Sequence, residues 1–398
     1  MNAPATTATS GREGPLAGVR VIDMSTVVMG PYAAQILGDL GADVIKIESP
    51  KDTVRNSTQY RNTPGMTPLH LNVNRNKRSV SLNLKDEAGH DQALRLISGA
   101  DILITNMRIG ALRRLGMDYD SLAAEHPHLI YAHAQGFRPD SERADLAAYD
   151  ETVQAASGLL DLAERAGDIG SPAVLPSIFG DKVAALTIAY STLAALHHQR
   201  ATGQGQLVEV PMTDTLLAFN MVEHLQGAVF EPPMSGTGFP LSMNKGHRAR
   251  PTKDGQVMIM PYTPQNCRDL FRAGGHPELA EDPRVNGEVL DARAHGAAIA
   301  ELIESVTPNL TTDEWIEVCT KNSIPVGPVL KLDEAAEDPY VRQGHLLDLG
   351  EHPSEGSYRV VGVPMNFSAT PASVREHAPI PGQHTDEVLD ELGQGGQR

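Results

Sequence analysis

Residues 18–48, GVRVIDMSTVVMGPYAAQILGDLGADVIKIE, decide the fold. Residues 18–24 are β-branched and apolar, which is typical of a buried parallel strand. Pro31 stands where a helix can begin, and the glycine that closes YAAQILGDLG stands near its end. Residues 42–48, ADVIKIE, have the composition of a second strand. Together these segments predict a βαβ unit of about thirty residues.

The same alternation continues through the N-terminal half of the chain. Further strands are expected at Ser79–Leu84, Ile102–Thr105 and Leu129–Ala134. Helices are expected between them, at Gly89–Ser98 and Tyr119–His126. A helix over residues 181–200, DKVAALTIAYSTLAALHHQR, has apolar residues all round and is therefore expected to be deeply buried. This order of elements predicts an α/β fold with a mostly parallel sheet.

From about residue 225 the sequence changes character. EPPMSGTGFP is rich in turn residues, GQVMIMPYT predicts a strand, and two helical patterns follow at residues 294–306 and 312–321. IPVGPVL, residues 324–330, begins an extended region that runs toward the C-terminus. At 398 residues the chain is too long for one ordinary core, so more than one domain is expected.

Composition and charge exclude several classes of function. The formal net charge of −17 disfavours nonspecific binding to nucleic acid or to an anionic membrane. The two cysteines, Cys267 and Cys319, have no partners at metal-ligand spacing, which disfavours both structural zinc and a disulfide framework. Neither a signal peptide nor an apolar run of about eighteen residues occurs, so a cytoplasmic protein is expected.

Two basic segments stand out against this acidic background. They are RNKRSVSLNLK, residues 75–85, and NMRIGALRR, residues 106–114, and neither contains an acid. Each is either a solvated basic face or part of an anion site for a phosphate-bearing small molecule. The chain has no G-x-G-x-x-G and no P-loop, which makes NAD and ATP poor candidates.

Several longer motifs occur in unbroken order across residues 15–393. They are VIDMSTVVMGPYAAQILGDLGADVIKIESP, NVNRNKRSVSLNLKDEAG, ILITNMRIGALRRLGMDYDSL, AAYDETVQAASG, FGDKVAALTIAYSTLAALHHQRATGQGQLVEVPMTD, NSIPVGPV and PGQHTDEVLDELG. In these stretches the chain resembles the family III CoA-transferases, the CaiB/BaiF-like group. Residues 230–320 are more divergent.

The resemblance implies a set of site residues. Asp181, in Gly180-Asp181-Lys182, matches the family's catalytic aspartate. The positions that match coenzyme A contacts are Val27, Val28, Met29, Leu82, Lys85, Asn106, Met107, Ala111, Arg114 and Gln135. Three positions differ from some relatives. Where this chain has Val28, Gln135 and Ser49, those relatives have a glutamine, a lysine and an arginine, respectively. No metal is implied.

The resemblance also implies an activity and an architecture. It implies transfer of coenzyme A from an acyl-CoA donor to a small carboxylic acid through a covalent aspartyl intermediate, with no permanently bound cofactor. It implies a large Rossmann-like domain over residues 15–224, a smaller α/β domain over 225–325 and a C-terminal return over 326–398. An interlocked, ring-like homodimer is implied as well.

Three other interpretations stay open at this point. An aspartate that opens an apolar helix, as Asp181 does, is often only an N-cap. The same fold family includes α-methylacyl-CoA racemases, which have a His-Asp pair where this chain has Tyr149-Asp150. Tyrosine is a poor base near neutral pH, because its ordinary pKa is about 10. A non-catalytic acyl-CoA-binding protein is the third possibility, and it needs the basic segments but no nucleophile.

Overall fold

The computed structural model describes residues 13–50, 61–167, 173–243 and 248–394. Contacts divide the chain into two compact units, and each is described by itself. Unit 1 comprises residues 1–157, 175–218 and 339–398, and unit 2 comprises residues 158–174 and 219–338. The domain boundaries expected at residues 225 and 325 remain a prediction.

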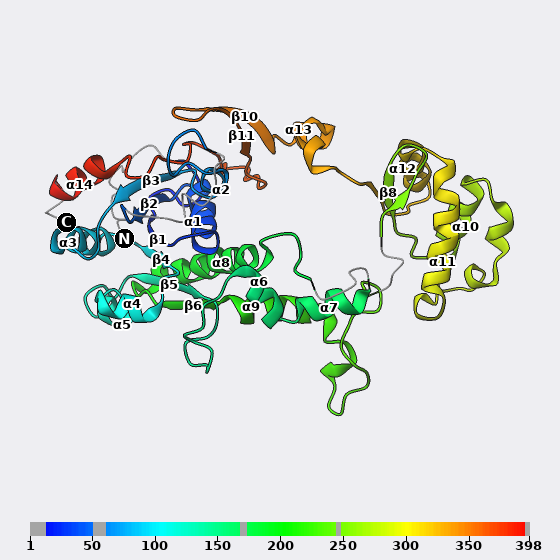
Figure 1. Ribbon diagram of the computed structural model, residues 1–398, viewed down its shortest axis with the longest axis horizontal. Coiled ribbons are helices and arrows are strands. Elements are labelled where there is room, and N and C mark those ends of the chain that lie inside the picture. Colours follow the sequence, from blue (N-terminus) through cyan, green and yellow to red (C-terminus); the bar gives the residue numbers. More distant parts are fainter. Residues whose placement is uncertain (1–12, 51–60, 168–172, 244–247, 395–398) are drawn as a thin grey trace, which may run out of the picture. The chain divides into compact units, whose positions relative to one another are not determined.

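Unit 1 is built on a six-stranded sheet that is parallel throughout (Figure 1). The strands are β1 (Arg20–Met24), β2 (Asp43–Glu48), β3 (Lys77–Ser81), β4 (Ile102–Thr105), β5 (Ile130–Gln135) and β6 (Leu207–Pro211). Their order is β3-β2-β1-β4-β5-β6, so the chain reverses direction across the sheet between β1 and β4. This is the order of a doubly wound α/β fold, in which ligands bind at the carboxyl ends of the strands where the order reverses.

Helices cover both faces of this sheet. On one face α1 (Met29–Asp39) packs against β1 and β2, and α8 (Phe179–Thr202) packs against α1, β5 and β6. On the other face Ile22, Ile45, Val80, Leu103 and Tyr131 share one apolar core with four helices. These are α3 (Glu87–Ser98), α4 (Ile109–Arg114), α5 (Tyr119–Ala123) and α14 (Thr385–Gln394).

A fully buried charge cluster lies at the centre of unit 1. The Asp23 carboxylate accepts hydrogen bonds from Lys77 Nζ at 2.8 Å and from Lys46 Nζ at 3.3 Å. Lys77 Nζ also donates to the Asn74 side chain at 2.9 Å and to the Pro31 carbonyl at 2.7 Å, so all three of its protons are used. Burial lowers the pKa of Lys77 to about 8, although the charge of Asp23 opposes this effect.

Three cations of the first basic segment therefore stabilise the fold. Arg75 pairs with Asp39 at 2.7 Å, and Arg78 pairs with Asp43 at 2.8 Å. With Lys77 bound to Asp23, the cations of residues 75–78 are buried and neutralised within the unit. Neither sequence interpretation, a solvated face or an anion site, holds for these three residues.

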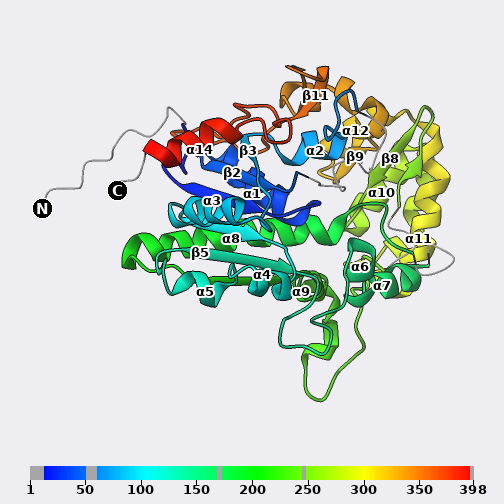
Figure 2. The ribbon, with the colours of Figure 1, turned by 60° about the vertical axis from the view of Figure 1, so that its left-hand side comes forward.

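The C-terminal motif covers the free edge of β3. Gly382 and His384 donate backbone hydrogen bonds to Ser79, and the Thr385 hydroxyl accepts one from the Ser81 amide at 3.1 Å. α14 then lies beside β3, as both views show (Figures 1 and 2). Such cover removes an exposed row of backbone groups on which another chain could pair. The expected extended run to the C-terminus is thus wrong at Leu332–Glu337, Pro339–Gln343 and Thr385–Gln394, where the chain is helical.

Unit 2 has a core of its own. A three-stranded antiparallel sheet, β7 (Arg250–Pro251), β8 (Gln256–Ile259) and β9 (Val326–Pro328), packs with α10 (Pro264–Ala273), α11 (Ala292–Val306) and α12 (Thr312–Lys321). Trp315 and both cysteines are buried in this core. Thr263 and Thr311 are the N-caps of α10 and α12, and the hydroxyl of each accepts a hydrogen bond from a backbone N–H in the first turn of its helix.

The long helix α8 is only half buried, which corrects the expectation of deep burial. Ala184, Ala185 and Ile188 face the sheet, whereas Leu186 and Tyr190 are 52% and 62% exposed. A helix that lies on one face of a sheet can bury only one side against it. Apolar residues on the outer side therefore indicate a surface that this chain does not cover with its own described residues.

We predict that Lys77→Met weakens the fold strongly. The change leaves Asp23 buried with a single cation and removes the donor to the Pro31 carbonyl, and breaking a buried ion pair costs about 3–5 kcal/mol. Chemical denaturation followed by circular dichroism measures the loss. Lys85→Met, at an exposed position beyond the end of β3, is the control and should stay within about 0.5 kcal/mol of the parent. Equal stability of the two variants contradicts the prediction.

Candidate functional site

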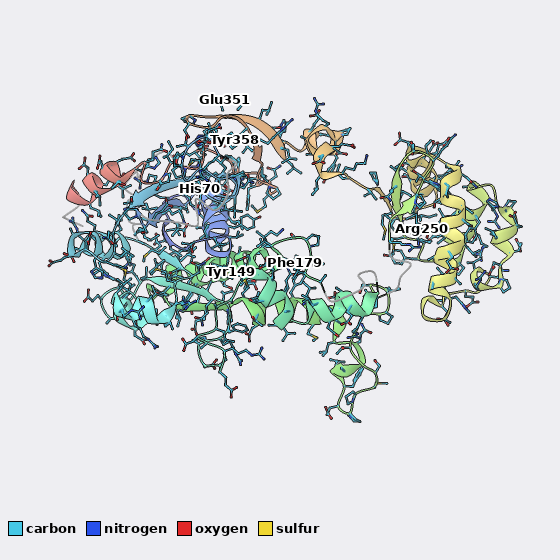
Figure 3. All side chains as sticks on the ribbon, in the orientation of Figure 1. His70, Tyr149, Phe179, Arg250, Glu351 and Tyr358 are labelled. Carbon is cyan, nitrogen blue, oxygen red and sulfur yellow. The ribbon has the colours of Figure 1, made fainter. Side chains whose placement is uncertain are left out.

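Asp181 lies in the first turn of α8, two residues after the helix begins at Phe179, which Figure 3 labels. Its side chain is inside the unit, and the residue is only 8% exposed. The first turn of a helix presents free backbone N–H groups and the positive end of the helix dipole. A carboxylate at this position is stabilised even though it has left bulk water.

Asp150 holds the start of α8 in place. One of its carboxylate oxygens accepts a hydrogen bond from the Asp181 backbone N–H at 3.0 Å, and the other accepts one from the Gln154 side chain at 2.5 Å. The Gln154 amide also bonds Ser177 and Leu175, which precede the helix. Asp150 therefore acts as a cap supplied by α6 (Asp150–Ala156), and it places a second negative charge beside Asp181.

These surroundings raise the pKa of the Asp181 carboxyl to about 6. Burial is the largest cause, and the charges of Asp150 and then Glu151 add to it. A hydrogen bond from the backbone N–H of Met29 opposes the rise, because it favours the ionised form. Asp181 is thus mostly ionised at neutral pH but is more basic than an ordinary aspartate.

The loop between β1 and α1 shapes the other side of this carboxyl. Val27 has a φ of 67°, a left-handed conformation that is a clear outlier for a β-branched residue. Val28 and Met29 follow it and are buried. A Cβ on Gly30 would lie 2.3 Å from the Ser25 side chain, so this tight turn requires glycine. The turn brings the Met29 amide to Asp181.

A cavity of about 610 Å³ opens at the carboxyl ends of β1, β2, β3 and β4. Five of the residues predicted to contact coenzyme A line it: Leu82, Lys85, Met107, Ala111 and Arg114. Lys85, Arg113 and Arg114 are exposed, and none of them forms an ion pair within the part of the chain that is described. Lys85 and Arg114 therefore keep the charge that an anionic ligand needs.

The other five predicted contacts lie elsewhere. Val27 and Val28 are in the loop beside Asp181, Met29 begins α1, and Gln135 ends β5. The Gln135 side-chain nitrogen is buried and has no hydrogen-bond partner among the described residues. The Asn106 carboxamide bonds the backbone of Thr26 through both of its polar atoms. Contact of all ten residues with a ligand remains a prediction.

Several cavity residues were missed in the sequence. Ser25, Thr26, Lys46, Glu48 and Asn83 line the cavity, and so does Ser49, where some relatives have an arginine. They share one signal: all but Lys46, which lies two residues before the end of β2, stand at or just after the carboxyl end of a strand of the parallel sheet. Asp150 was seen only as part of a dipeptide, because its bond to Asp181 spans 31 residues.

The described residues contain neither a cluster of metal ligands nor a membrane-spanning helix. Among them no three His, Cys, Asp or Glu side chains gather as a metal site requires. Within those same ranges, no helix has both the length and the apolar character needed to cross a bilayer.

Comparison with known proteins gives a consistent result. Residues 16–385 match the family model described as CoA-transferase family III. Formyl-CoA:oxalate CoA-transferases of Escherichia coli O6:H1 and O139:H28 are each 33% identical to this chain, over 95% of it and 96% of their own length.

Solved structures agree with this result. A CAIB/BAIF family protein from Brucella suis superposes with a TM-score of 0.81 at 26% identity and covers 96% of this chain and 100% of its own. The orthorhombic form of Rv3272 from Mycobacterium tuberculosis superposes with a TM-score of 0.78 at 26% identity, covering 94% and 99%.

We predict that Asp150→Asn lowers the pKa of Asp181. Asparagine keeps an oxygen that accepts from the Asp181 N–H, but it removes one of the two charges that raise this pKa. Carbon-13 NMR of aspartate-labelled protein measures the titration, and the signal is assigned by its loss in Asp181→Asn. Glu151→Gln is the matched control and should have a smaller effect in the same direction. An unchanged or raised pKa in Asp150→Asn contradicts the electrostatic account.

Proposed function

The chain belongs to CoA-transferase family III and is an enzyme, and on this premise we propose that it transfers coenzyme A between an acyl-CoA donor and a free carboxylic acid through a covalent intermediate on Asp181. One observation carries the proposal. The Asp181 carboxyl is buried at the start of α8 with a pKa near 6 and accepts a hydrogen bond from the Met29 amide. A nucleophile needs to be both ionised and basic, and these surroundings provide both properties.

The reaction proceeds in four acyl transfers. The Asp181 carboxylate attacks the donor thioester, which forms a mixed anhydride and releases CoA thiolate. The thiolate attacks the aspartyl carbonyl of the anhydride, so that the donor acid leaves and an aspartyl-CoA thioester remains. The acceptor carboxylate then attacks this thioester and again frees the thiolate. Finally the thiolate attacks the acceptor's own carbonyl, which produces the new acyl-CoA and restores Asp181.

Two features of the site support these steps. Each attack builds negative charge on a carbonyl oxygen, and the backbone amides at the starts of α1 and α8 are the groups that can stabilise it. Asp150 fixes the helix start through the Asp181 backbone N–H. A cation in its place would lower the pKa of the Asp181 carboxyl, whereas Asp150 leaves the carboxylate basic. Asp181 is not the N-cap of α8, because Ile178 holds that position, so capping does not explain why an acid is buried beside a second acid.

The cavity at the carboxyl ends of the strands supports a coenzyme A site. Its walls combine apolar side chains, including Leu82 and Met107, with the ammonium of Lys85 and the guanidinium of Arg114. Phosphate groups bind such paired cations, and the apolar walls suit the adenine and the pantetheine chain. We propose that Lys85 and Arg114 bind the phosphates. The second substrate is a small carboxylic acid.

Two competing activities are less well supported. Tyr149, which Figure 3 labels, stands where racemases have a histidine. It is 68% exposed. His133 is buried, its Nε2 bonds the Met107 carbonyl at 2.9 Å, and burial lowers its pKa, so it does not replace that histidine. A protein that only binds acyl-CoA has no use for an acid that is held buried beside another acid.

We also propose a homodimer in the cytoplasm. The outer side of α8, with Leu186 and Tyr190, is the kind of apolar surface that a second copy covers. The free, buried thiols of Cys267 and Cys319 suit a reducing compartment.

Replacing Asp181 tests the proposal directly. Asp181→Asn should lower the rate of CoA transfer by at least about a thousandfold, because no covalent intermediate can form. Hydroxylamine added after the donor should modify Asp181 in the parent, as peptide mass spectrometry will show, and nothing in the variant. Asp120→Asn, on the exposed start of α5, is the control and should transfer at the parental rate.

A deuterium experiment separates transferase from racemase with the same preparations. A chiral 2-methylacyl-CoA incubated in deuterium oxide should keep its configuration and its α-hydrogen, because attack at the thioester carbonyl involves no α-proton. Deuterium entering the α-position at a catalytic rate without an acceptor acid would identify a racemase. Undiminished transfer by Asp181→Asn would exclude the covalent mechanism.

Charge removal tests the cavity. Lys85→Ala and Arg114→Ala should each raise the KM for acyl-CoA about tenfold while the KM for the free acid stays nearly constant, because only the first substrate carries phosphate. Arg113→Ala is the matched control, since Arg113 is equally exposed on α4 but does not line the cavity. Initial rates at fixed ionic strength measure both constants. Equal changes for both substrates, or for all three variants, contradict the assignment.

A further inference from the structure

The loops that follow β1 and β4 begin side by side and then separate. Met24 and Thr105 are paired in the sheet, and the Thr105 hydroxyl donates to the Met24 carbonyl at 3.1 Å. Beyond these residues the chain turns to α1 on one face of the sheet and to α4 on the other. Both loops line the cavity, through Ser25 and Thr26 in the first and Met107 in the second, and the first loop leads on to the Met29 amide beside Asp181.

Asn106 joins the two loops. Its Oδ1 accepts a hydrogen bond from the Thr26 backbone N–H at 2.9 Å, and its Nδ2 donates to the Thr26 carbonyl at 2.9 Å. The carboxamide thereby continues the pairing of β1 with β4 by one further step. Both polar atoms of the side chain are engaged in this bridge, which is a different use from contact with a ligand.

The residue that follows the bridge is conformationally strained. Val27 has a φ of 67°, and a non-glycine residue in such a conformation persists only where its surroundings impose it. The Asp23 carboxylate fixes Ser25 before the strained residue, and Lys77 fixes the Pro31 carbonyl after it. Between those two anchors, the bonds of Asn106 hold the backbone directly next to Val27.

We propose that Asn106 is a positioning residue, which clamps Thr26 so that the strained loop holds the Met29 N–H against the Asp181 carboxyl. This inference rests on the proposed role of Asp181 as nucleophile. Asn106 acts through Thr26 and Met29 and touches neither Asp181 nor the reacting atoms in this arrangement. It replaces the expectation that the Asn106 side chain serves as a contact for coenzyme A.

The experiment measures the first acyl transfer as a function of pH. Parent and Asn106→Ala are mixed with an acyl-CoA donor alone, and the aspartyl adduct at Asp181 is trapped and counted between pH 5 and 9. In Asn106→Ala the rate at neutral pH should fall about tenfold, less than the hundredfold or more that follows complete loss of such a donor. The acidic limb of the profile should move to higher pH.

The direction of that movement follows from the hydrogen bond. The Met29 N–H lowers the pKa of Asp181, against burial and the charges of Asp150 and Glu151, which raise it. Without a well-placed Met29 amide the pKa rises, so a larger fraction of Asp181 is protonated and unreactive at a given pH. The rate of the first acyl transfer therefore falls most at acidic pH, and the acidic limb of the profile lies at higher pH than in the parent.

Lys85→Ala serves as the comparison, because loss of a phosphate contact should raise the KM for the donor and leave the acidic limb where it is in the parent. Asn106→Ser is the second variant. Its hydroxyl is too short to reach both backbone groups of Thr26, so the upward movement should recur. Thermal unfolding followed by circular dichroism confirms that the variants are folded, as expected for a bridge at the surface.

The outcomes are distinguishable. A raised KM for the donor with a parental acidic limb, in both Asn106 variants, overturns the inference and makes Asn106 a coenzyme A contact. An upward movement of the limb in both variants supports it. If the parent itself forms no adduct at Asp181, the proposed function fails instead, and that result is visible before any Asn106 variant is compared.

Discussion

The buried carboxylate of Asp23 is the constraint on which unit 1 depends. It lies at the end of the central strand β1 and is held by two ammonium groups that come from β2 and β3. Burial alone would raise the pKa of Asp23, but Lys46, Lys77 and the hydrogen bonds outweigh it, and the pKa lies well below its usual range. The same cations bond the carbonyls of Ser25 and Pro31, so this one ion cluster ties three strands to both ends of the β1–α1 loop.

The geometry of the site around Asp181 depends on that ion cluster. A loop pinned at both ends can hold Val27 in an unfavourable conformation and present the Met29 amide to Asp181. α8 arrives from far along the chain with its own first turn at the same place, and Asp150 fixes it there. Two helix starts thus meet at one carboxyl, which favours its ionised form, while burial and two neighbouring acids keep it basic.

Positive charge is used in two different ways within a few residues. Arg75, Lys77 and Arg78 are buried and paired with aspartates, which holds the strands together. Arg78 also pairs with Glu391 of α14 and so holds the C-terminal segment. Lys85, which follows β3 on the same segment, lines the cavity together with Arg114. The buried and the cavity-lining cations of this segment are separated by the carboxyl end of β3. Side chains inside the sheet contact other elements, whereas those beyond its carboxyl end face the open crevice.

The sequence by itself determined the class of fold and the identity of the candidate nucleophile. Period and composition predicted the first βαβ unit and the parallel sheet, and the ordered motifs pointed to Asp181. It could not separate Lys77 from Lys85, predict the half-exposed face of α8, or show that Asn106 bonds Thr26 across 80 residues. Local patterns report on neighbours along the chain, whereas burial, ion pairing and pKa depend on groups brought together from distant segments. Only the tertiary structure decided which cations are paired with aspartates inside the fold and how the surroundings of Asp181 set its basicity.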